Sequence, residues 1–259
     1  MQSRDPKLEK LYQKWKQEEA IAHIVGWDFS HIADRYREED SLPWDFQAVI
    51  QRNLTEDKKL LDMETGGGEF LLRLGHPYQN TAAIEGYPPN VDFCKEHLLP
   101  LGIDFKEADG ADVLPFADEQ FDIVTNRHGD YSCAELRRVL KPDGLFLTQQ
   151  VGAENDRELI QLLQPEIQQT AFPMHYLDYR KKELEEHGFA VLESAEAYGP
   201  IQFFDVGALV WFARIIEWEF PGFEVDKYFE SLCRAQAILE RDGLIQGRTH
   251  RFYMVARKR

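Results

Sequence analysis

The stretch LLDMETGGGEF, residues 60–70, constrains the fold more than any other part of this chain. An apolar run ends at Asp62, three consecutive glycines follow at positions 66–68, and an amphipathic pattern resumes at Phe70. Glycine permits tight turns and lets a ligand approach the main chain closely. The stretch therefore predicts a buried strand, a glycine turn and a helix, with the turn as a ligand-binding loop.

Short β-rich runs and helical patterns alternate from Lys59 onward. The predicted strands are KLLDM, TAAIEG, IDFKEAD, FDIVTN and GLFLTQQV, and the predicted helices begin near Glu69, Pro88 and Cys133. The Lys141–Gly144 stretch, KPDG, is a strong signal for a turn after the third helix. Strands separated by helical crossovers indicate an α/β fold with a doubly wound, parallel sheet.

The remaining segments extend this core at both ends. LDYRKKELEEHGF predicts a helix, AVLESAEAY a strand, 205–219 and 225–241 two helices, and THRFYMVARK a final strand. We predict a main domain over 57–259 with a helical insertion at about 203–242, and an N-terminal helical cap or lid over 1–56. We expect these additions to close over the ligand and form the substrate pocket, because they contain all five tryptophans: Trp15, Trp27, Trp44, Trp211 and Trp218.

The charges around the glycine loop limit the ligand. A nicotinamide dinucleotide would require G-x-G-x-x-G and a phosphate loop G-x-x-x-x-G-K-[ST]; neither is present, and no Lys or Arg lies between Lys59 and Arg73. Glu85 ends the second predicted strand, where an acid can accept hydrogen bonds from a ribose diol. Asp109 follows the third. Carboxylates without a nearby cation favour an adenosine with a positive charge, and S-adenosylmethionine is that molecule.

The segments LLDMETGGGEFLLRL, AAIEGYPPNV, ADGADVLPFADEQFDIV and LRRVLKPDGLFLTQQ occur in an order that resembles the class I S-adenosylmethionine-dependent methyltransferases. The broad small-molecule group of that family shares a D-x-G-x-G-x-G loop and an LPF…FD segment. The resemblance implies a Rossmann-like sheet of seven strands with the last strand antiparallel. It implies that Asp62, Gly66 and Gly68 line the methionine moiety, Glu85 the ribose hydroxyls and Asp109 the adenine amino group, with Asp112 as the alternative to Asp109. The candidate cofactor site also includes their neighbours Glu64, Thr65, Gly86, Gly110 and Asn126.

Glu64 stands where the family loop has its first glycine. A left-handed backbone here would strain a residue with a side chain. In another interpretation Glu64 intrudes on the methionine site and weakens binding. We favour a third, in which the backbone is ordinary and the carboxylate attracts the positive end of the cofactor.

Methyl transfer from a sulfonium needs alignment of the reactants, and a base only when the acceptor must lose a proton. His128 follows the fourth predicted strand and is the candidate base, although a histidine there can simply pack or hydrogen-bond. The predicted function is methyl transfer to a small, partly apolar acceptor. The alternatives are an RNA methyltransferase and a cofactor-binding protein without transfer activity.

The formal charge of −16 opposes attraction to a phosphate backbone and makes nucleic acid an unfavoured partner. The three cysteines form no C-x-x-C pair, so no metal site is predicted. The most apolar window, Val206–Ala213, is too short to cross a bilayer, and the polar N-terminus lacks the pattern of a signal peptide. We expect a cytoplasmic protein. Its oligomeric state and methyl acceptor are not predicted.

Overall fold

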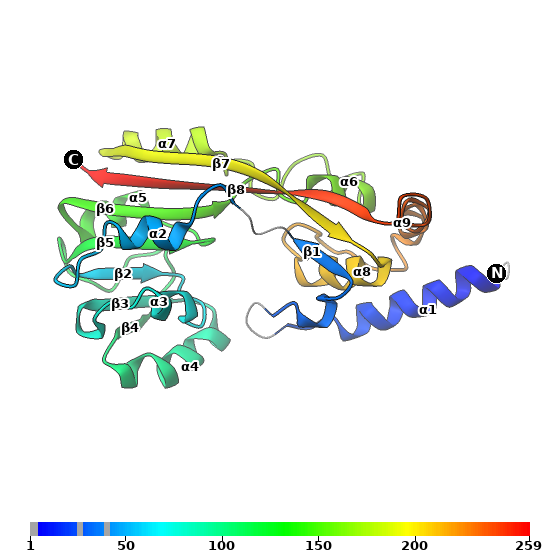
Figure 1. The fold of residues 1–259 in the computed structure, drawn as a ribbon, viewed down its shortest axis with the longest axis horizontal. Coiled ribbons are helices and arrows are strands. Elements are labelled where there is room, and N and C mark those ends of the chain that lie inside the picture. Colours follow the sequence, from blue (N-terminus) through cyan, green and yellow to red (C-terminus); the bar gives the residue numbers. More distant parts are fainter. Residues whose placement is uncertain (1–4, 25–27, 39–41) are drawn as a thin grey trace. The chain divides into compact units, whose positions relative to one another are not determined.

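A computed structural model describes residues 5–24, 28–38 and 42–259 (Figure 1). Its helices are α1 (Pro6–Ile21), α2 (Phe46–Gln51), α3 (Glu69–Arg73), α4 (Pro88–His97), α5 (Cys133–Val139), α6 (Arg157–Leu163), α7 (Leu177–Glu186), α8 (Val206–Ile215) and α9 (Phe229–Asp242). Its strands are β1 (Tyr36–Glu38), β2 (Leu60–Met63), β3 (Thr81–Glu85), β4 (Asp104–Glu107), β5 (Phe121–Arg127), β6 (Leu140–Val151), β7 (Phe189–Phe203) and β8 (Ile245–Lys258).

The chain divides into two compact units, and β7 and β8 run through both. The strand-end unit consists of Leu42–Gly152, Met174–Ala197 and Arg251–Arg259. The helical unit consists of the described parts of Met1–Ser41 together with Ala153–Pro173 and Tyr198–His250. The first contains the predicted glycine loop. The second contains parts of both predicted additions.

The strands form one sheet in the order β1-β7-β8-β6-β5-β2-β3-β4. Strands β2 to β6 pair in parallel, whereas β8 runs antiparallel to β6. The predicted doubly wound α/β fold with an antiparallel last strand is confirmed. The sheet has one strand more than the predicted seven, because Tyr36–Glu38 pairs antiparallel with β7.

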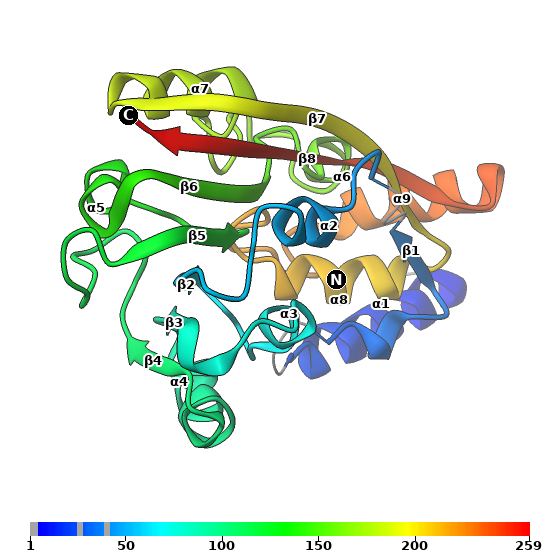
Figure 2. The same ribbon diagram turned by 60° about the vertical axis from the view of Figure 1, so that its left-hand side comes forward.

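Helices cover both faces of the sheet in the strand-end unit, whose strands β2 to β6 are visible in Figure 2. Successive strand residues point to opposite faces, so Leu60 joins a core built with α2, α3 and α4. Its neighbour Leu61 joins a second core with α5 and α7. Because both faces are covered, β2 and β3 are buried along their whole length and largely apolar, as parallel strands usually are, apart from the acids near their carboxyl ends.

The core of the helical unit surrounds α8, the most apolar helix, of which eight residues are buried. Asp205 caps this helix by accepting a hydrogen bond from the backbone N–H of Ala208. Residues from α1, α6 and α9 pack against α8. No helix in the described ranges has both the length and the apolar character that a membrane crossing requires.

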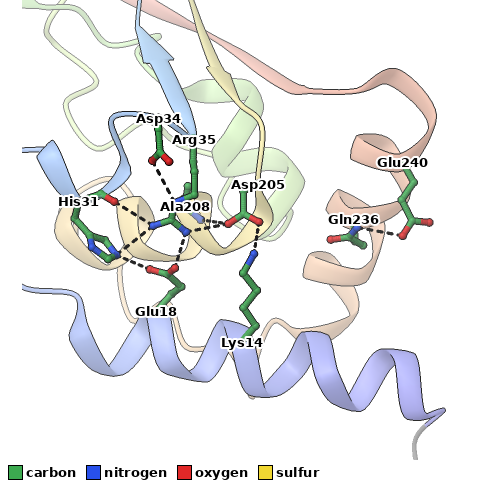
Figure 3. A network of polar contacts seen from close by, with 9 residues as sticks. All are labelled: Lys14, Glu18, His31, Asp34, Arg35, Asp205, Ala208, Gln236 and Glu240. Carbon is green, nitrogen blue, oxygen red and sulfur yellow. Dashed lines mark hydrogen bonds and ion pairs between the residues drawn. The ribbon is translucent and has the colours of Figure 1, made fainter.

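A polar network joins α1 to the start of α8 (Figure 3). Arg35 donates to Glu18 at 2.6 Å and to Asp205 at 3.1 Å. Lys14 also reaches Asp205 at 2.6 Å, and the His31 ring lies 2.8 Å from the Glu18 carboxylate. Two carboxylates thus share three basic groups, which fixes α1 on the helical unit.

The structure differs from the predicted elements mainly at their ends. The predicted turn at Lys141–Gly144 lies inside β6, where Asp143 has a φ of 61° and the pairing with β5 shifts from Phe121↔Leu140 to Ile123↔Leu145. The helices predicted at 205–219 and 225–241 occupy 206–215 and 229–242. Apolar spacing predicted these helices but carried little information about where they end.

Candidate functional site

The candidate residues lie at the carboxyl ends of four parallel strands. Asp62 is opposite Thr125 in the pairing of β2 with β5, and Met63 is opposite Asn126. Glu85 ends β3 beside Glu107 of β4. Parallel strands end at the same edge of a sheet, and in open α/β sheets this edge is where ligands bind.

Asp62 is buried and holds its surroundings together. Its two carboxylate oxygens accept hydrogen bonds from the hydroxyls of Thr125, at 2.6 Å, and Thr65, at 2.8 Å. Burial raises the pKa of Asp62, against the lowering effect of these hydroxyls. Through its hydrogen bonds with Thr65 and Thr125, the carboxylate holds the loop after β2 against β5. Sequence reasoning missed Thr125, because only the strand register places it next to Asp62.

Gly66 and Gly68 have left-handed backbones, with φ of 63° and 81°. A Cβ added at Gly66 would meet no atom within 4 Å, so the backbone there borders open space. A Cβ at Gly68 would lie 2.8 Å from the Leu98 side chain. Gly66 thus exposes main chain to a ligand, whereas Gly68 allows close packing against the segment after α4.

Glu85 is buried and accepts three backbone hydrogen bonds. Its Oε2 accepts from the N–H of Gly66 at 2.7 Å, and its Oε1 accepts from those of Gly86, at 3.0 Å, and Tyr87, at 2.8 Å. Each carboxylate oxygen has two acceptor positions, so Oε2 keeps one for a ligand hydroxyl. Glu85 also ties the loop after β2 to the loop after β3.

Glu64 has a φ of 55°, in the left-handed region. Our prediction of an ordinary backbone here is therefore wrong. The loop keeps the glycine-like conformation although the residue has changed, at a strain of about 1–2 kcal/mol. The side chain nevertheless makes a contact, because Oε1 accepts a hydrogen bond from the N–H of Gly110 at 2.6 Å.

The side chain of Glu64 lies between the loops after β4 and β5. A Cβ at Gly110 would lie 2.6 Å from the carbonyl oxygen of Asp130, and one at Gly129 would lie 2.4 Å from Cγ of Glu64. Both positions therefore require glycine. Sequence reasoning did not select Gly129, because its role depends on a side chain far away along the chain. Asp109, the predicted adenine contact, is exposed and accepts from the N–H of Ala111.

Burial raises the pKa of Glu64 to about 7. The Gly110 N–H opposes this rise, while the negative charges of Glu85, Asp109 and Asp130 add to it. Around neutral pH, Glu64 therefore holds a proton part of the time. A cation beside it would favour the charged form.

The side-chain amide of Asn126 is buried, and only its oxygen takes part in hydrogen bonds among the described residues. Its Oδ1 accepts from Gln150 at 2.6 Å, which sets the orientation of the amide. Its Nδ2 is buried and has no hydrogen-bond acceptor in the described part of the chain. A buried donor without an acceptor is costly, and a ligand oxygen would satisfy it. A Cβ at Gly129 would lie 3.2 Å from this nitrogen, so it is close to Glu64.

The ring of His128 is linked to the indole of Trp44 through the side chain of Gln149. The indole N–H of Trp44 donates to Oε1 of Gln149 at 2.9 Å, and Nε2 of Gln149 lies 3.4 Å from Nε2 of His128. Because the Gln149 amide presents its NH₂ group to Nε2 of His128, Nε2 is the acceptor, and the proton of the neutral ring is assigned to Nδ1. Surrounding protein and the guanidiniums of Arg251 and Arg127 lower the pKa of His128. His128 is also exposed to solvent, so the shift is smaller than full burial would cause.

The aromatic residues of the predicted additions have different environments. Trp15 and Trp211 are buried in the core of the helical unit, as their apolar character favours. Trp218 and Phe204 are exposed. Trp27 lies outside the described residues.

Residues 61–148 match the family model described as "Methyltransferase domain". This stretch includes every candidate residue named above from Asp62 to His128. The chain therefore contains a methyltransferase domain, in agreement with its resemblance to the class I, S-adenosylmethionine-dependent methyltransferases.

The similarity to curated relatives is partial. A "Probable phthiotriol/phenolphthiotriol dimycocerosates methyltransferase 2" of Mycobacterium ulcerans is 36% identical over 100 residues, which cover 34% of this chain and 38% of the relative. A "Ubiquinone/menaquinone biosynthesis C-methyltransferase" of Paraburkholderia phymatum is 28% identical over 151 residues, or 52% and 60% of the two chains. The match thus spans less than two thirds of either relative.

Solved structures agree in fold. The YcgJ protein of Bacillus subtilis superposes with a TM-score of 0.55 at 19% identity, covering 83% of this chain and 98% of its own. A functionally unknown protein from Deinococcus radiodurans reaches 0.56 at 15% identity, covering 98% and 100%. At these identities the likeness concerns the fold alone.

Proposed function

We propose that this protein is an S-adenosylmethionine-dependent methyltransferase acting on a small, partly apolar acceptor. The observation that carries the proposal is the family match at 61–148, which contains the strand-end residues of β2, β3 and β5. Asp62, Glu85 and Asn126 lie at or next to these ends, where we propose that the cofactor binds.

The residues fit the proposed cofactor. Gly66 borders open space and presents bare main chain. Glu85 keeps an acceptor position for a ribose hydroxyl, and the buried Nδ2 of Asn126 requires an oxygen such as that of a carboxylate. Asp109, exposed beyond β4, is the proposed partner of the adenine amino group.

Bound S-adenosylmethionine would supply an electrophilic methyl group together with its leaving group. The contribution of this chain is then mainly alignment, with the loop held on β5 by Asp62 and on β3 by Glu85. His128 is the proposed base for acceptors that lose a proton. Its lowered pKa keeps the ring neutral at pH 7, and Nε2 would accept that proton after releasing its contact with Gln149.

The names of the relatives support an apolar acceptor. The matched proteins of Mycobacterium ulcerans and Paraburkholderia phymatum are named for methyl transfer in dimycocerosate lipid and quinone formation. Both names describe hydrophobic acceptors. RNA is the less favoured acceptor because of the net charge of −16.

Calorimetric titration tests the proposal. The protein should bind S-adenosylmethionine and its demethylated product S-adenosylhomocysteine, and it should not respond to NAD⁺. Transfer of a radioactive methyl group to quinol and phenolic lipid acceptors should follow, with total cellular RNA as the comparison. Binding of NAD⁺ alone would exclude the proposal. Binding without transfer to any acceptor would favour the alternative, a cofactor-binding protein.

A further inference from the structure

The side chains of Trp44, Gln149 and His128 form a chain of hydrogen bonds at the carboxyl ends of β5 and β6. The indole N–H of Trp44 donates to Oε1 of Gln149 at 2.9 Å. At the other end of the same amide, Nε2 of Gln149 lies 3.4 Å from Nε2 of His128. An indole nitrogen can donate a hydrogen bond but cannot accept one. Trp44 therefore selects the oxygen of the amide and turns its NH₂ group toward the imidazole.

Each member of this chain is held by its own surroundings. Gln149 is buried and lies in the sheet between Arg127 of β5 and Tyr253 of β8. The ring of Tyr253 packs against Trp44, with the centroids 5.0 Å apart. The backbone N–H of His128 donates to the carbonyl oxygen of Gln149 at 2.9 Å, and its φ of 58° is left-handed. Such a backbone strains a residue with a side chain and persists only where other contacts hold it.

The direction of these hydrogen bonds decides which nitrogen of the neutral imidazole carries the proton. The NH₂ group of Gln149 needs an acceptor, so Nε2 of His128 offers its lone pair and Nδ1 keeps the proton. In water a histidine side chain favours the opposite tautomer, with the proton on Nε2. The hydrogen bonds that start at Trp44 thus hold the less common tautomer. His128 is exposed, so a ligand can reach its ring.

We propose that Trp44 and Gln149 are positioning residues, which keep the proton of neutral His128 on Nδ1 and so reserve Nε2 for a proton from the methyl acceptor. This inference rests on the proposed function and narrows the acceptor to one that reacts through an O–H or N–H group. The amide N–H of Gln149 already donates toward Nε2, as the acceptor's O–H or N–H would after displacing it.

The proposed step moves one proton and one methyl group. The O–H or N–H proton of the acceptor moves to Nε2 of His128, and the electron pair left on oxygen or nitrogen forms the bond to the methyl carbon. The S–CH₃ bond breaks, and its electron pair stays on sulfur. The guanidiniums of Arg251 and Arg127 help to lower the pKa of His128, so the exposed ring gives the proton up to solvent. Gln149 can then restore its hydrogen bond to Nε2.

Nitrogen-15 NMR of the histidine rings tests the tautomer without any ligand, because protonated and unprotonated ring nitrogens differ strongly in chemical shift. At pH 8, above the ordinary pKa of histidine, His128 of the wild type should carry its proton on Nδ1. The variant His128→Asn identifies its signals. Two rings that contact carbonyl oxygens serve as references for the two tautomers: Nδ1 of His97 contacts Phe93, and Nε2 of His76 contacts Lys58.

Three variants change the chain of hydrogen bonds. Gln149→Glu presents an oxygen that accepts, so Nε2 of His128 should carry a proton. Gln149→Met removes both polar ends at similar length, and the tautomer with the proton on Nε2 should dominate, as in water. Trp44→Phe releases the amide and should give a mixture of both tautomers. The matched control is Gln47→Met, because the Gln47 amide donates to the carbonyl oxygen of Arg73 instead; its spectrum of His128 should equal that of the wild type.

A transfer assay connects the tautomer with the reaction. With a phenolic acceptor, kcat of Gln149→Met and Trp44→Phe should fall in proportion to the fraction of His128 that keeps its proton on Nδ1, because only that form can accept a proton at Nε2. Gln149→Glu should have the lowest kcat. The dissociation constant of S-adenosylmethionine should stay close to that of the wild type in all three variants.

The outcomes separate this inference from the proposed function. A proton on Nε2 of His128 in the wild type, or an unchanged tautomer in Gln149→Glu, would overturn the inference and leave the proposed function standing. Changed tautomers with an unchanged kcat would overturn the role of Nε2 in proton transfer, again without touching methyl transfer itself. Failure of the wild type to bind S-adenosylmethionine would overturn the proposed function together with the role given to Nε2, whatever the tautomer.

Discussion

At the scale of single residues, the acids at the strand ends have distinct roles. Asp62 and Glu85 have similar burial, but Asp62 binds two threonine hydroxyls whereas Glu85 binds three backbone N–H groups. Asp109 is exposed and accepts a hydrogen bond from the N–H of Ala111 in its own turn. The residue types alone predicted a cofactor site. The hydrogen-bond partners add which acids hold the loops in place and which keep an acceptor position for a ligand.

Replacing Glu85 by Ala should weaken S-adenosylmethionine binding and also lower the melting temperature. The loss of one charge-assisted hydrogen bond to ribose corresponds to about 1.5–3 kcal/mol. Three backbone donors would lose their acceptor as well. Calorimetric titration and thermal unfolding measure the two effects.

The matched control is Glu107→Ala. Glu107 pairs with Glu85 across the strands, but it is exposed and its ion-pair partner is Lys95. An exposed ion pair contributes about 0–1 kcal/mol, so this variant should behave almost like the wild type. Equal losses in both variants would indicate a general effect of charge at this edge and contradict a specific role of Glu85.

At the scale of elements, α1 depends on the polar network of Figure 3 for its position on the helical unit. Arg35→Ala should destabilise the protein by about 1–3 kcal/mol at pH 7, because it leaves partly buried Glu18 and Asp205 with fewer partners. Chemical denaturation measures this loss. Arg241→Ala, which removes an exposed pair with Asp242, is the control and should change little.

The penalty of Arg35→Ala should depend on pH. Burial raises the pKa of Glu18, but the hydrogen bonds and charges of Arg35 and His31 outweigh it and hold that pKa below 4.5. The pKa of Asp205 is likewise held below 3.8. A lowered carboxyl pKa adds stability above its ordinary value, and this stability is lost as the pH falls. The difference between variant and wild type should therefore decrease below about pH 4. A penalty independent of pH would assign it to lost packing alone.

At the scale of the whole molecule, the N-terminal segment and the C-terminal insertion belong largely to one compact unit. Its core joins α1 with α8 and α9, which are far apart along the chain. We keep the prediction that these additions close over the bound cofactor and shape the acceptor pocket, because loops and lids that move on binding come from less stable parts of a fold.

Hydrogen exchange tests this closure. Peptides covering residues 10–45 should gain protection when S-adenosylmethionine is added, whereas β2 and β5 should exchange slowly in both states. Peptides from α9, in the same unit, show whether any gain extends through that unit. Unchanged exchange in 10–45 would identify the N-terminal segment as a fixed structural element.

The sequence by itself determined the fold class and the place of the site. Three signals are local in the sequence: glycines after an apolar run, acids after the next strands, and a change in the spacing of apolar residues from about two, as in a strand, to about 3.6, as in a helix. Asp62, Glu85 and Asn126 could be found from these signals. Register, by contrast, depends on contacts between distant segments. Only the tertiary structure could therefore place Thr125 beside Asp62, add β1 to the sheet, or bring Gly110 and Gly129 against Glu64. That last contact explains how a charged residue occupies a left-handed position: two distant glycines make room for its side chain, and one of them donates the hydrogen bond that holds it.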